Sequence, residues 1–183
     1  MPLTALPDNP FYDGDSPNVD SIYSYGHRNP FDFPFDPLSV GVRMFVSENG
    51  PGCDHEINFI QPGNNYSWHA GYQCDDAAGL DPARNTIPPM PFWTPPTAPV
   101  GITFCTGDDI PERRGDVFLR SDLDSTLHHL KLNFARNGFV SHSALTDVYC
   151  RTDVFTGSEG AWYFVQGGGF EPGALRRLVR RAP

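Results

Sequence analysis

Short runs of alternating or β-branched apolar residues recur along the whole chain, with turn residues between them. We predict strands at ten of these runs: 21–26, 31–36, 42–48, 56–61, 100–106, 116–121, 126–132, 152–157, 161–166 and 174–180. Within one run, His128 and His129 alternate faces, which predicts that one is buried and the other exposed. No segment shows a convincing helical apolar stripe. The pattern therefore predicts an all-β protein.

Composition and spacing refine this fold class. The 183 residues include 18 Gly and 19 Pro, which is typical of a chain with many turns and few long helices. The length suits one domain, which we place at 1–183. A turn followed by an apolar strand recurs at "GVRMFV", "RGDVFL" and "GAWYFV", as in propeller blades. Residues 71–99 are rich in proline and weakly patterned, and we predict a loop between blades there.

The charge and the hydropathy exclude two classes of partner. The formal net charge is -9, so the chain lacks the positive field that sequence-independent nucleic-acid binding requires. The basic run at 176–181 is interrupted by apolar residues, and we interpret it as a last strand with exposed arginines. The sequence contains no run of 18 apolar residues, so it predicts no membrane-spanning helix. The start, "MPLTALPDNPFYDG", does not have the pattern of a secretory signal.

The four cysteines indicate an oxidising compartment. Cys53, Cys74, Cys105 and Cys150 contain no C-x-x-C spacing, which disfavours a zinc knuckle or a thioredoxin-type pair. Two structural disulfides are the preferred interpretation. Because Cys53 and Cys74 flank one loop-rich segment, we expect Cys53 to pair with Cys74, and Cys105 with Cys150. The other pairings remain possible, as do four reduced thiols.

Four motifs, in this order, carry a family resemblance: "YGHRNPFDFPFDP", "VSENGPGCDHEINFIQPGNNYSW", "APVGITFCTGDDIPERRGDVFL" and "TDVFTGSEGAWYFV". They resemble the soluble glucose/sorbosone (aldose sugar) dehydrogenases that depend on pyrroloquinoline quinone (PQQ), over most of residues 20 to 180. The resemblance implies a six-bladed β-propeller with the quinone and calcium on one face. This chain is similar to the later part only, so we expect a partial β-propeller of about three to four blades.

The resemblance also implies site residues. Arg28 and Asn29 match the pair that hydrogen-bonds the quinone, whose carboxylates suit a guanidinium. Gly50 and Pro51 match the pair whose backbone carbonyls bind the cofactor's calcium. Glu56, with the Tyr66 carbonyl, matches a second calcium-binding turn of some members.

Simpler interpretations exist for three of these residues. Arg28 would serve equally as a surface ion-pair residue, and Asn29 as a turn former before Pro30. Glu56 would serve as an exposed carboxylate on an edge strand.

The same resemblance implies an aldose sugar as substrate, an electron acceptor as partner, and an extracytoplasmic location for the full-length protein. In the family, the histidine that removes the substrate proton lies on an earlier blade, which has no counterpart here. We therefore assign no catalytic residue, and expect a fragment that is inactive alone.

An alternative function follows from a difference between this chain and the family that it resembles. Where relatives carry further basic residues, this chain has Asp122, Leu123, Cys150 and Thr152, with Arg120 and Arg151 nearby. That departure favours a non-enzymatic, extracellular binding module of the same ancestry.

Overall fold

The computed structural model describes residues 4–74, 92–93, 97–150, 153–168 and 171–179. These residues form eleven strands, one short α-helix, α1 (Pro17–Asp20), and a 3-10 turn, Pro111–Arg113. The all-β prediction is confirmed. No helix in the described part of the chain is long and apolar enough to cross a membrane.

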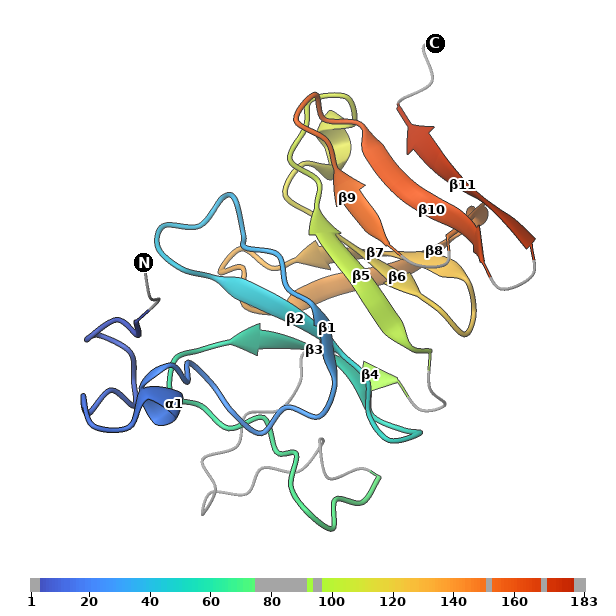
Figure 1. The fold of residues 1–183 in the computed structure, drawn as a ribbon. Helices are drawn as coiled ribbons and strands as arrows, with labels where there is room; N and C mark the ends of the chain where they lie inside the picture. Colours follow the sequence, from blue (N-terminus) through green and yellow to red (C-terminus); the bar gives the residue numbers. More distant parts are fainter. Residues whose placement is uncertain (1–3, 75–91, 94–96, 151–152, 169–170, 180–183) are drawn as a thin grey trace.

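The strands form three antiparallel sheets, in each of which every strand pairs with its neighbour in the sequence (Figure 1). The first sheet comprises β1 (Pro30–Asp32), β2 (Met44–Glu48), β3 (His55–Ile60) and β4 (Phe92–Trp93). The second comprises β5 (Pro99–Phe104), β6 (Val117–Ser121), β7 (Thr126–Leu132) and β8 (Phe139–Tyr149). The third comprises β9 (Val154–Thr156), β10 (Trp162–Gly168) and β11 (Glu171–Leu178).

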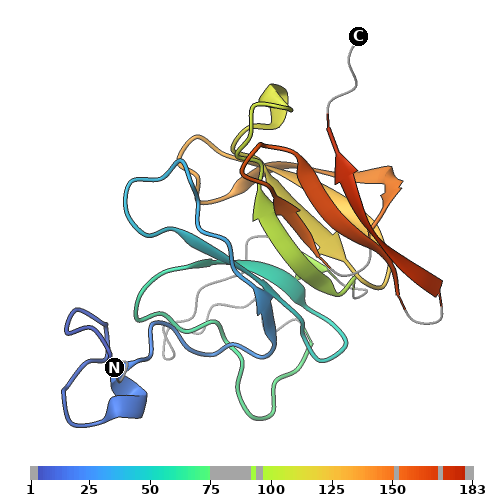
Figure 2. The same ribbon diagram turned by 45° about the horizontal axis from the view of Figure 1, so that its top comes forward.

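The second sheet lies between the other two, and an apolar cluster fills each interface. Phe45 and Ile57 of the first sheet pack against Ile102 and Leu119 of the second. On the other side, residues such as Phe118 and Trp162 join the second sheet to the third. Figure 2 shows the same succession of sheets from another side.

The first strands of the three sheets lie next to one another. The Asp32 carboxylate on β1 accepts a hydrogen bond from the Ile102 backbone N–H on β5, at 3.0 Å. The Thr156 hydroxyl on β9 donates to the Phe104 carbonyl, at 2.6 Å. Sheets of consecutive antiparallel strands, stacked with their first strands together, form part of a β-propeller. The predicted partial propeller is confirmed, with three sheets among the described residues.

An ion pair between a buried carboxylate and a partly exposed guanidinium ties the first sheet to the second. Asp36 follows β1, and Arg136 lies in the turn between β7 and β8. Two guanidinium N–H groups of Arg136 donate to the two oxygens of Asp36, the Nη2–Oδ1 distance being 2.7 Å. Arg136 Nη2 also donates to the Gly115 carbonyl, at 2.9 Å. Such a two-pronged pair fixes both distance and orientation.

Some predicted strands differ from the observed ones. The prediction at 21–26 is wrong, because only Tyr25 makes an isolated bridge there, with Asn65. The other nine ranges each overlap a strand. The prediction omitted two strands, the two-residue β4 and β8; β8 is the last strand of its sheet and alternates Ser and His with apolar residues. Most of the loop predicted at 71–99 lies outside the described residues, apart from β4 and the ends.

The two cysteine pairs have different outcomes. The Cys53–Cys74 disulfide is present, with an S–S distance of 2.07 Å. The predicted Cys105–Cys150 disulfide is wrong: both are buried thiols in the cluster between the second and third sheets. The Cys150 thiol donates to the Asp153 carbonyl, at 3.4 Å. These residues act as small apolar core groups rather than as a cross-link.

The prediction of one exposed histidine is also wrong. His128 and His129 are both buried. Their strand, β7, belongs to the middle sheet, where one face packs on the first sheet and the other on the third. Alternation on a middle blade therefore separates two interfaces rather than a core from solvent.

Candidate functional site

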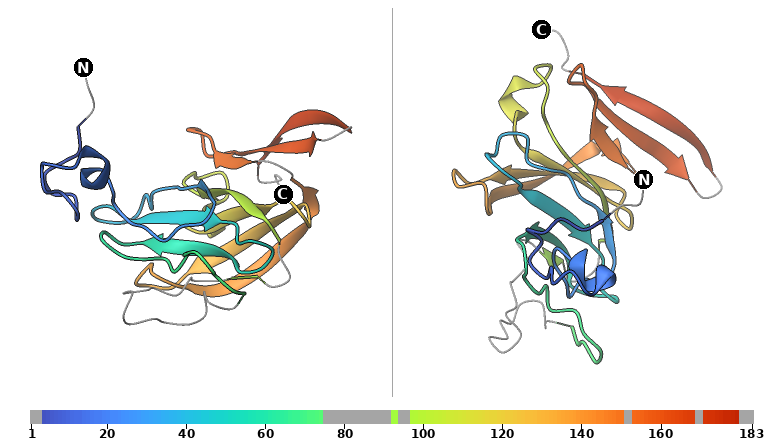
Figure 3. Two further views of the ribbon diagram at one scale, coloured as in Figure 1. Left: turned by 60° about the horizontal axis from the view of Figure 1, so that its bottom comes forward. Right: turned by 60° about the vertical axis from the view of Figure 1, so that its left-hand side comes forward.

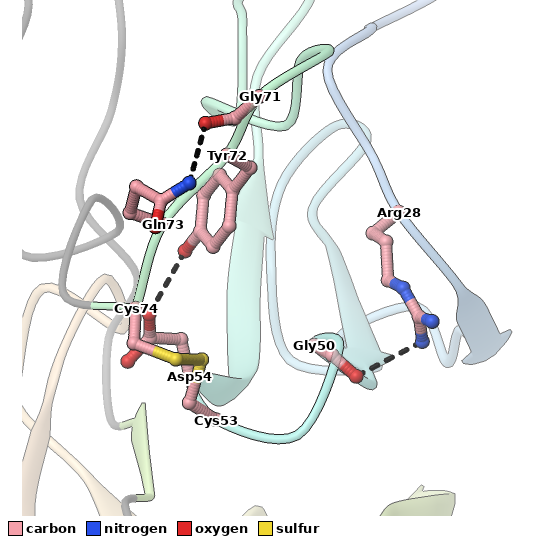
Figure 4. The surroundings of a disulfide bond; sticks show 8 residues. All are labelled: Arg28, Gly50, Cys53, Asp54, Gly71, Tyr72, Gln73 and Cys74. Atoms are coloured by element: carbon pink, nitrogen blue, oxygen red, sulfur yellow. Dashed lines mark hydrogen bonds between the residues drawn. A yellow bond between two sulfur atoms is a disulfide. The ribbon is translucent and has the colours of Figure 1, made fainter.

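The loop between β2 and β3 shapes one end of the first sheet, and Gly50 is required there. A Cβ atom on Gly50 would lie 1.8 Å from the Cys53 carbonyl oxygen, so no other residue fits this turn. The disulfide joins Cys53 to Cys74, and the Tyr72 hydroxyl donates to the Asp54 carboxylate at 3.1 Å (Figure 4). These contacts hold the loop at the edge of a small pocket.

The segment before β1 brings Arg28 to the same place. It runs beside residues 63–68, where the Trp68 N–H donates to the Gly26 carbonyl at 2.8 Å. A Cβ on Gly26 would lie 1.9 Å from the Asn65 side chain, so this close approach also needs glycine. The Arg28 guanidinium lies 5.7 Å from the Trp68 ring centroid, within the range of a cation–π contact.

Arg28 and Gly50 are in direct contact. The Arg28 Nη1 donates to the Gly50 carbonyl at 2.9 Å (Figure 4). It also donates to the Asn49 carbonyl, at 3.2 Å. Pro51 lines the same pocket. Asn29 is exposed, and its carbonyl accepts a hydrogen bond from the Asn49 N–H at 3.1 Å. The structure thus brings together Arg28, Gly50 and Pro51, whereas Asn29 is not among the residues that line the pocket.

The Glu48 side chain contacts the backbone of Arg28. Its carboxylate accepts hydrogen bonds from the Arg28 backbone N–H and, at 3.3 Å, from the Asn58 amide. It also contacts His27 Nδ1 at 2.9 Å. The His27 ring stacks on Tyr66, with a centroid distance of 4.7 Å. This network fixes the backbone from which the Arg28 side chain projects.

Glu56 is the least satisfied polar group of the pocket. It lies on β3 between β2 and β4, and its side chain is buried, which contradicts the exposed edge-strand interpretation. One oxygen accepts from Asn58 at 2.7 Å, but Oε2 has no hydrogen-bond partner in the described structure. Burial raises the Glu56 pKa to about 8, and the charges of Glu48 and Asp54 contribute to the increase.

The pocket is rich in oxygen atoms. Three carboxyl groups, one guanidinium and several aromatic side chains line it; the lining residues are Arg28, Glu48, Gly50, Pro51, Asp54, Glu56, Tyr66, Trp68 and Tyr72. Among the described residues, no three His, Cys, Asp or Glu side chains form a group that could hold a metal ion. A cation here would therefore need main-chain oxygens as well as side-chain carboxyl groups.

The sequence interpretation missed Glu48, Asp54, Trp68 and Tyr72 as pocket residues. One signal was available for Glu48. It pairs directly with Glu56 across β2 and β3, and two like charges in register destabilise a sheet unless something compensates them. An acid at the end of each of two adjacent predicted strands was therefore a sign of a site.

Arg120 of the second sheet does not line this pocket. Arg120 is fully buried on β6, and its Nε donates to the Cys150 carbonyl at 2.7 Å. Its Nη2 donates to the Asp122 carboxylate at 3.1 Å. Leu123 is 64% exposed at the next turn. Arg151 and Thr152 lie outside the described residues.

The amino-acid sequence is similar to those of known proteins. The profile of the family described as Glucose / Sorbosone dehydrogenase matches residues 4–177. An uncharacterized protein of Synechocystis is 31% identical over 87% of this chain, and aldose sugar dehydrogenase YliI of Escherichia coli is 29% identical over 85%. Quinoprotein glucose dehydrogenase B of Acinetobacter calcoaceticus is 44% identical over 70 residues. The chain spans 39%, 43% and 13% of these relatives, respectively.

Solved structures agree with the fold. A glucose dehydrogenase superposes with a TM-score of 0.81 and 25% identity, over 97% of this chain and 51% of that one. The PQQ-bound aldose sugar dehydrogenase of Streptomyces coelicolor superposes with a TM-score of 0.69 and 23% identity, over 96% of this chain and 48% of that one. This chain thus corresponds to about half of each.

Proposed function

Because this chain belongs to the glucose/sorbosone dehydrogenase family, we propose that its pocket binds calcium and a PQQ-type quinone in a protein that oxidises aldose sugars. The observation that carries the proposal is the contact between the Arg28 guanidinium and the Gly50 carbonyl, 2.9 Å apart in one pocket. A cation and a calcium-binding carbonyl at one place suit a ligand with several carboxylates.

The donor set of the pocket is compatible with calcium. Calcium is a hard cation that prefers carboxylate and carbonyl oxygens. Gly50, Pro51 and Glu56 present such oxygens, and Glu56 Oε2 has no partner among the described residues. The carboxyl groups of Glu48, Asp54 and Glu56 line the same pocket, so a divalent cation bound there would stabilise their ionised forms together. The Tyr66 carbonyl is proposed as a further ligand.

Arg28 would orient the organic ligand. Its guanidinium is exposed at the pocket edge and is held by Trp68 and by two carbonyls, so little side-chain freedom is lost on binding. Asn29, exposed and next to Arg28 in the sequence, is proposed to donate a second hydrogen bond. When bound, the quinone would accept the electrons of the sugar, and an external acceptor would then remove them. The described residues bind and orient, and no catalytic base is assigned among them.

An extracytoplasmic location is part of this proposal. The Cys53–Cys74 disulfide supports it, because such bonds persist mainly in oxidising compartments.

Binding measurements on the purified chain test the proposal without requiring turnover. Calorimetric titration should detect calcium binding, and Glu56→Gln should weaken it. Titration with PQQ in the presence of calcium should show binding that Arg28→Ala weakens by about tenfold or more, through the loss of charge-assisted hydrogen bonds. Arg43→Ala is the matched control, because Arg43 lies at the other end of the first sheet, where it donates to the Ala135 carbonyl.

The binding-module alternative rests on the second sheet. Arg120 is engaged between sheets, and an apolar residue, Leu123, is exposed at the next turn, where relatives supply cations. Calcium binding without PQQ binding would contradict the enzyme proposal and support this alternative. Loss of both would contradict the proposed site altogether.

A further inference from the structure

We propose that β8 is a docking edge, at which two copies of this chain pair strand to strand, antiparallel, about a twofold axis. Three observations support this: the length and exposure of β8, its lack of the residues that usually protect an edge strand, and a sequence that suits pairing with itself. The proposal concerns the outer edge of the second sheet and does not depend on the ligand of the pocket.

β8 (Phe139–Tyr149) is the longest described strand, with 11 residues, and is the last strand of the second sheet. Among the described residues, β7 is the only strand that pairs with it. Residues 140–144 are all exposed, and the exposed fraction of Val140 is 62%. Figure 3 shows β8, in orange, at the outer border of its sheet. The outer side of such an edge presents backbone N–H and C=O groups to another strand.

The three sheets differ in how their outer edges are protected. β4, the last strand of the first sheet, is only two residues long. β11, at the edge of the third sheet, contains Pro172 and two exposed arginines, Arg176 and Arg177. Short strands, proline and charged side chains are common means of preventing edge strands from pairing. Residues 139–145 of β8 contain neither proline nor a charged side chain, so this edge is the least protected of the three.

The sequence of β8 suits pairing with a second copy of itself. β8 pairs with β7 in regular register from Ser141 to Leu145, so we centre the proposed pairing on Ser143, the middle of that stretch. Antiparallel pairing about Ser143 places His142 opposite Ala144 of the second copy. It likewise places Leu145 opposite Ser141. Each large side chain thus faces a small one, and the two copies of Ser143 face each other at the axis.

Charge does not oppose this pairing. The formal net charge of the chain is -9, so most contacts between two copies would bring like charges together. Asp147 is the one charged residue in the sequence of β8, and it would lie opposite Phe139 of the second copy rather than opposite another aspartate. A twofold contact uses the same surface on both copies, so the assembly closes at two.

The first test is the mass of the chain in solution, by analytical ultracentrifugation at about pH 8, where histidine is neutral. At about 0.1 mM we expect twice the monomer mass of 20.3 kDa, because so short a pairing forms a small interface of micromolar affinity. Ser143→Lys and Ser143→Glu each place like charges opposite each other, and should raise the dissociation constant by at least about tenfold. Leu175→Lys is the matched control, because Leu175 is 65% exposed on another edge strand, β11.

Cysteine substitution tests the register. Ser143→Cys would place two thiols directly opposite each other, within the Cα separation that a disulfide requires. Ser141→Cys is the matched control, because its two copies would lie roughly four residues, or about 13 Å, apart along the paired strands. Mild oxidation should therefore cross-link the first variant into covalent dimers and leave the second monomeric on a denaturing gel without reductant.

A mixture of Ser143→Lys and Ser143→Glu completes the test. Opposite charges then face each other at the axis, so the mixture should regain the dimer mass that each variant alone loses. A monomeric wild-type chain, a dimer that neither charged substitution weakens, a mixture that stays monomeric, or equal cross-linking of the two cysteine variants would each overturn the proposal. Circular dichroism of each variant verifies that its fold is retained.

Discussion

Two buried carboxylates at opposite ends of the first sheet have opposite surroundings. Asp36 receives two guanidinium hydrogen bonds from Arg136 and one from the Leu38 N–H. Glu56 receives one from the Asn58 amide, and its other oxygen has no described partner. Both oxygens of Asp36 have hydrogen-bond partners within the protein, whereas only one oxygen of Glu56 has a described partner. We infer that the Asp36 end serves the fold and that the Glu56 end serves a ligand.

The largest effect on stability is expected at the end of the first sheet that contains Asp36. Arg136→Ala would leave the Asp36 carboxylate buried without its counter-charge, and would cut the tie between the first and second sheets. Loss of one partner of a buried pair costs about 3–5 kcal/mol. Urea denaturation should show this decrease in the free energy of unfolding. A decrease below about 1 kcal/mol would mean that the pair does not hold the sheets together.

The next largest effect on stability is expected from the Cys53–Cys74 disulfide, at the end of the first sheet that contains Glu56. Replacing both Cys53 and Cys74 by serine removes a cross-link with a sequence separation of 21. Chain entropy predicts a loss of about 3 kcal/mol. Hydrogen exchange should show faster opening of the loop at 49–54, while the turn that carries Arg136 stays protected. Equal loosening of both turns would contradict the view that the two ends are independent.

The pH dependence tests Glu56 directly. Its folded pKa of about 8 lies above the ordinary value of 4.5, so the folded protein keeps a proton that the unfolded chain releases. The free energy of unfolding should therefore fall as pH rises from 4.5 to 8, by about 1.4 kcal/mol per pH unit. Glu56→Gln should remove this contribution to the slope. An unchanged slope would show that Glu56 does not titrate in this range.

The smallest effect is expected at an exposed pair. Arg114 and Asp108 lie 2.7 Å apart, but both side chains are more than half exposed. Arg114→Ala should change the free energy of unfolding by less than about 0.5 kcal/mol, because solvent screens such pairs. Both this variant and Arg136→Ala remove one arginine, but only Arg136 has a buried partner. Comparing their thermal melts therefore separates the effect of removing a charge from the effect of leaving a buried carboxylate unpaired.

Much of the fold followed from local pattern, since nine of the predicted strand ranges overlap observed strands. The errors arose where tertiary contacts decide exposure. His128 and His129 are both buried because their sheet has a neighbour on each face. The last strand of the second sheet, β8, is rich in polar residues, so the alternation of a half-buried strand was hard to see there. Neither feature is visible within one segment.

The candidate site divides in the same way. The motifs located Arg28, Gly50 and Pro51, and the structure places all three at one pocket. Glu48 was missed because its position below Arg28 depends on the pairing of β2 with β3. The exposed interpretation of Glu56 was wrong because β4 covers the edge of β3, through a pairing far along the chain. Partners of long sequence separation are what local patterns omit.

The two buried thiols have a practical consequence for the interface between the second and third sheets. Burial raises the pKa of Cys105, so little of it is the thiolate that reacts with alkylating agents. Cys150 belongs to the same cluster. Slow alkylation of the native protein would therefore report how often these two sheets separate, without any label having to be engineered into the chain.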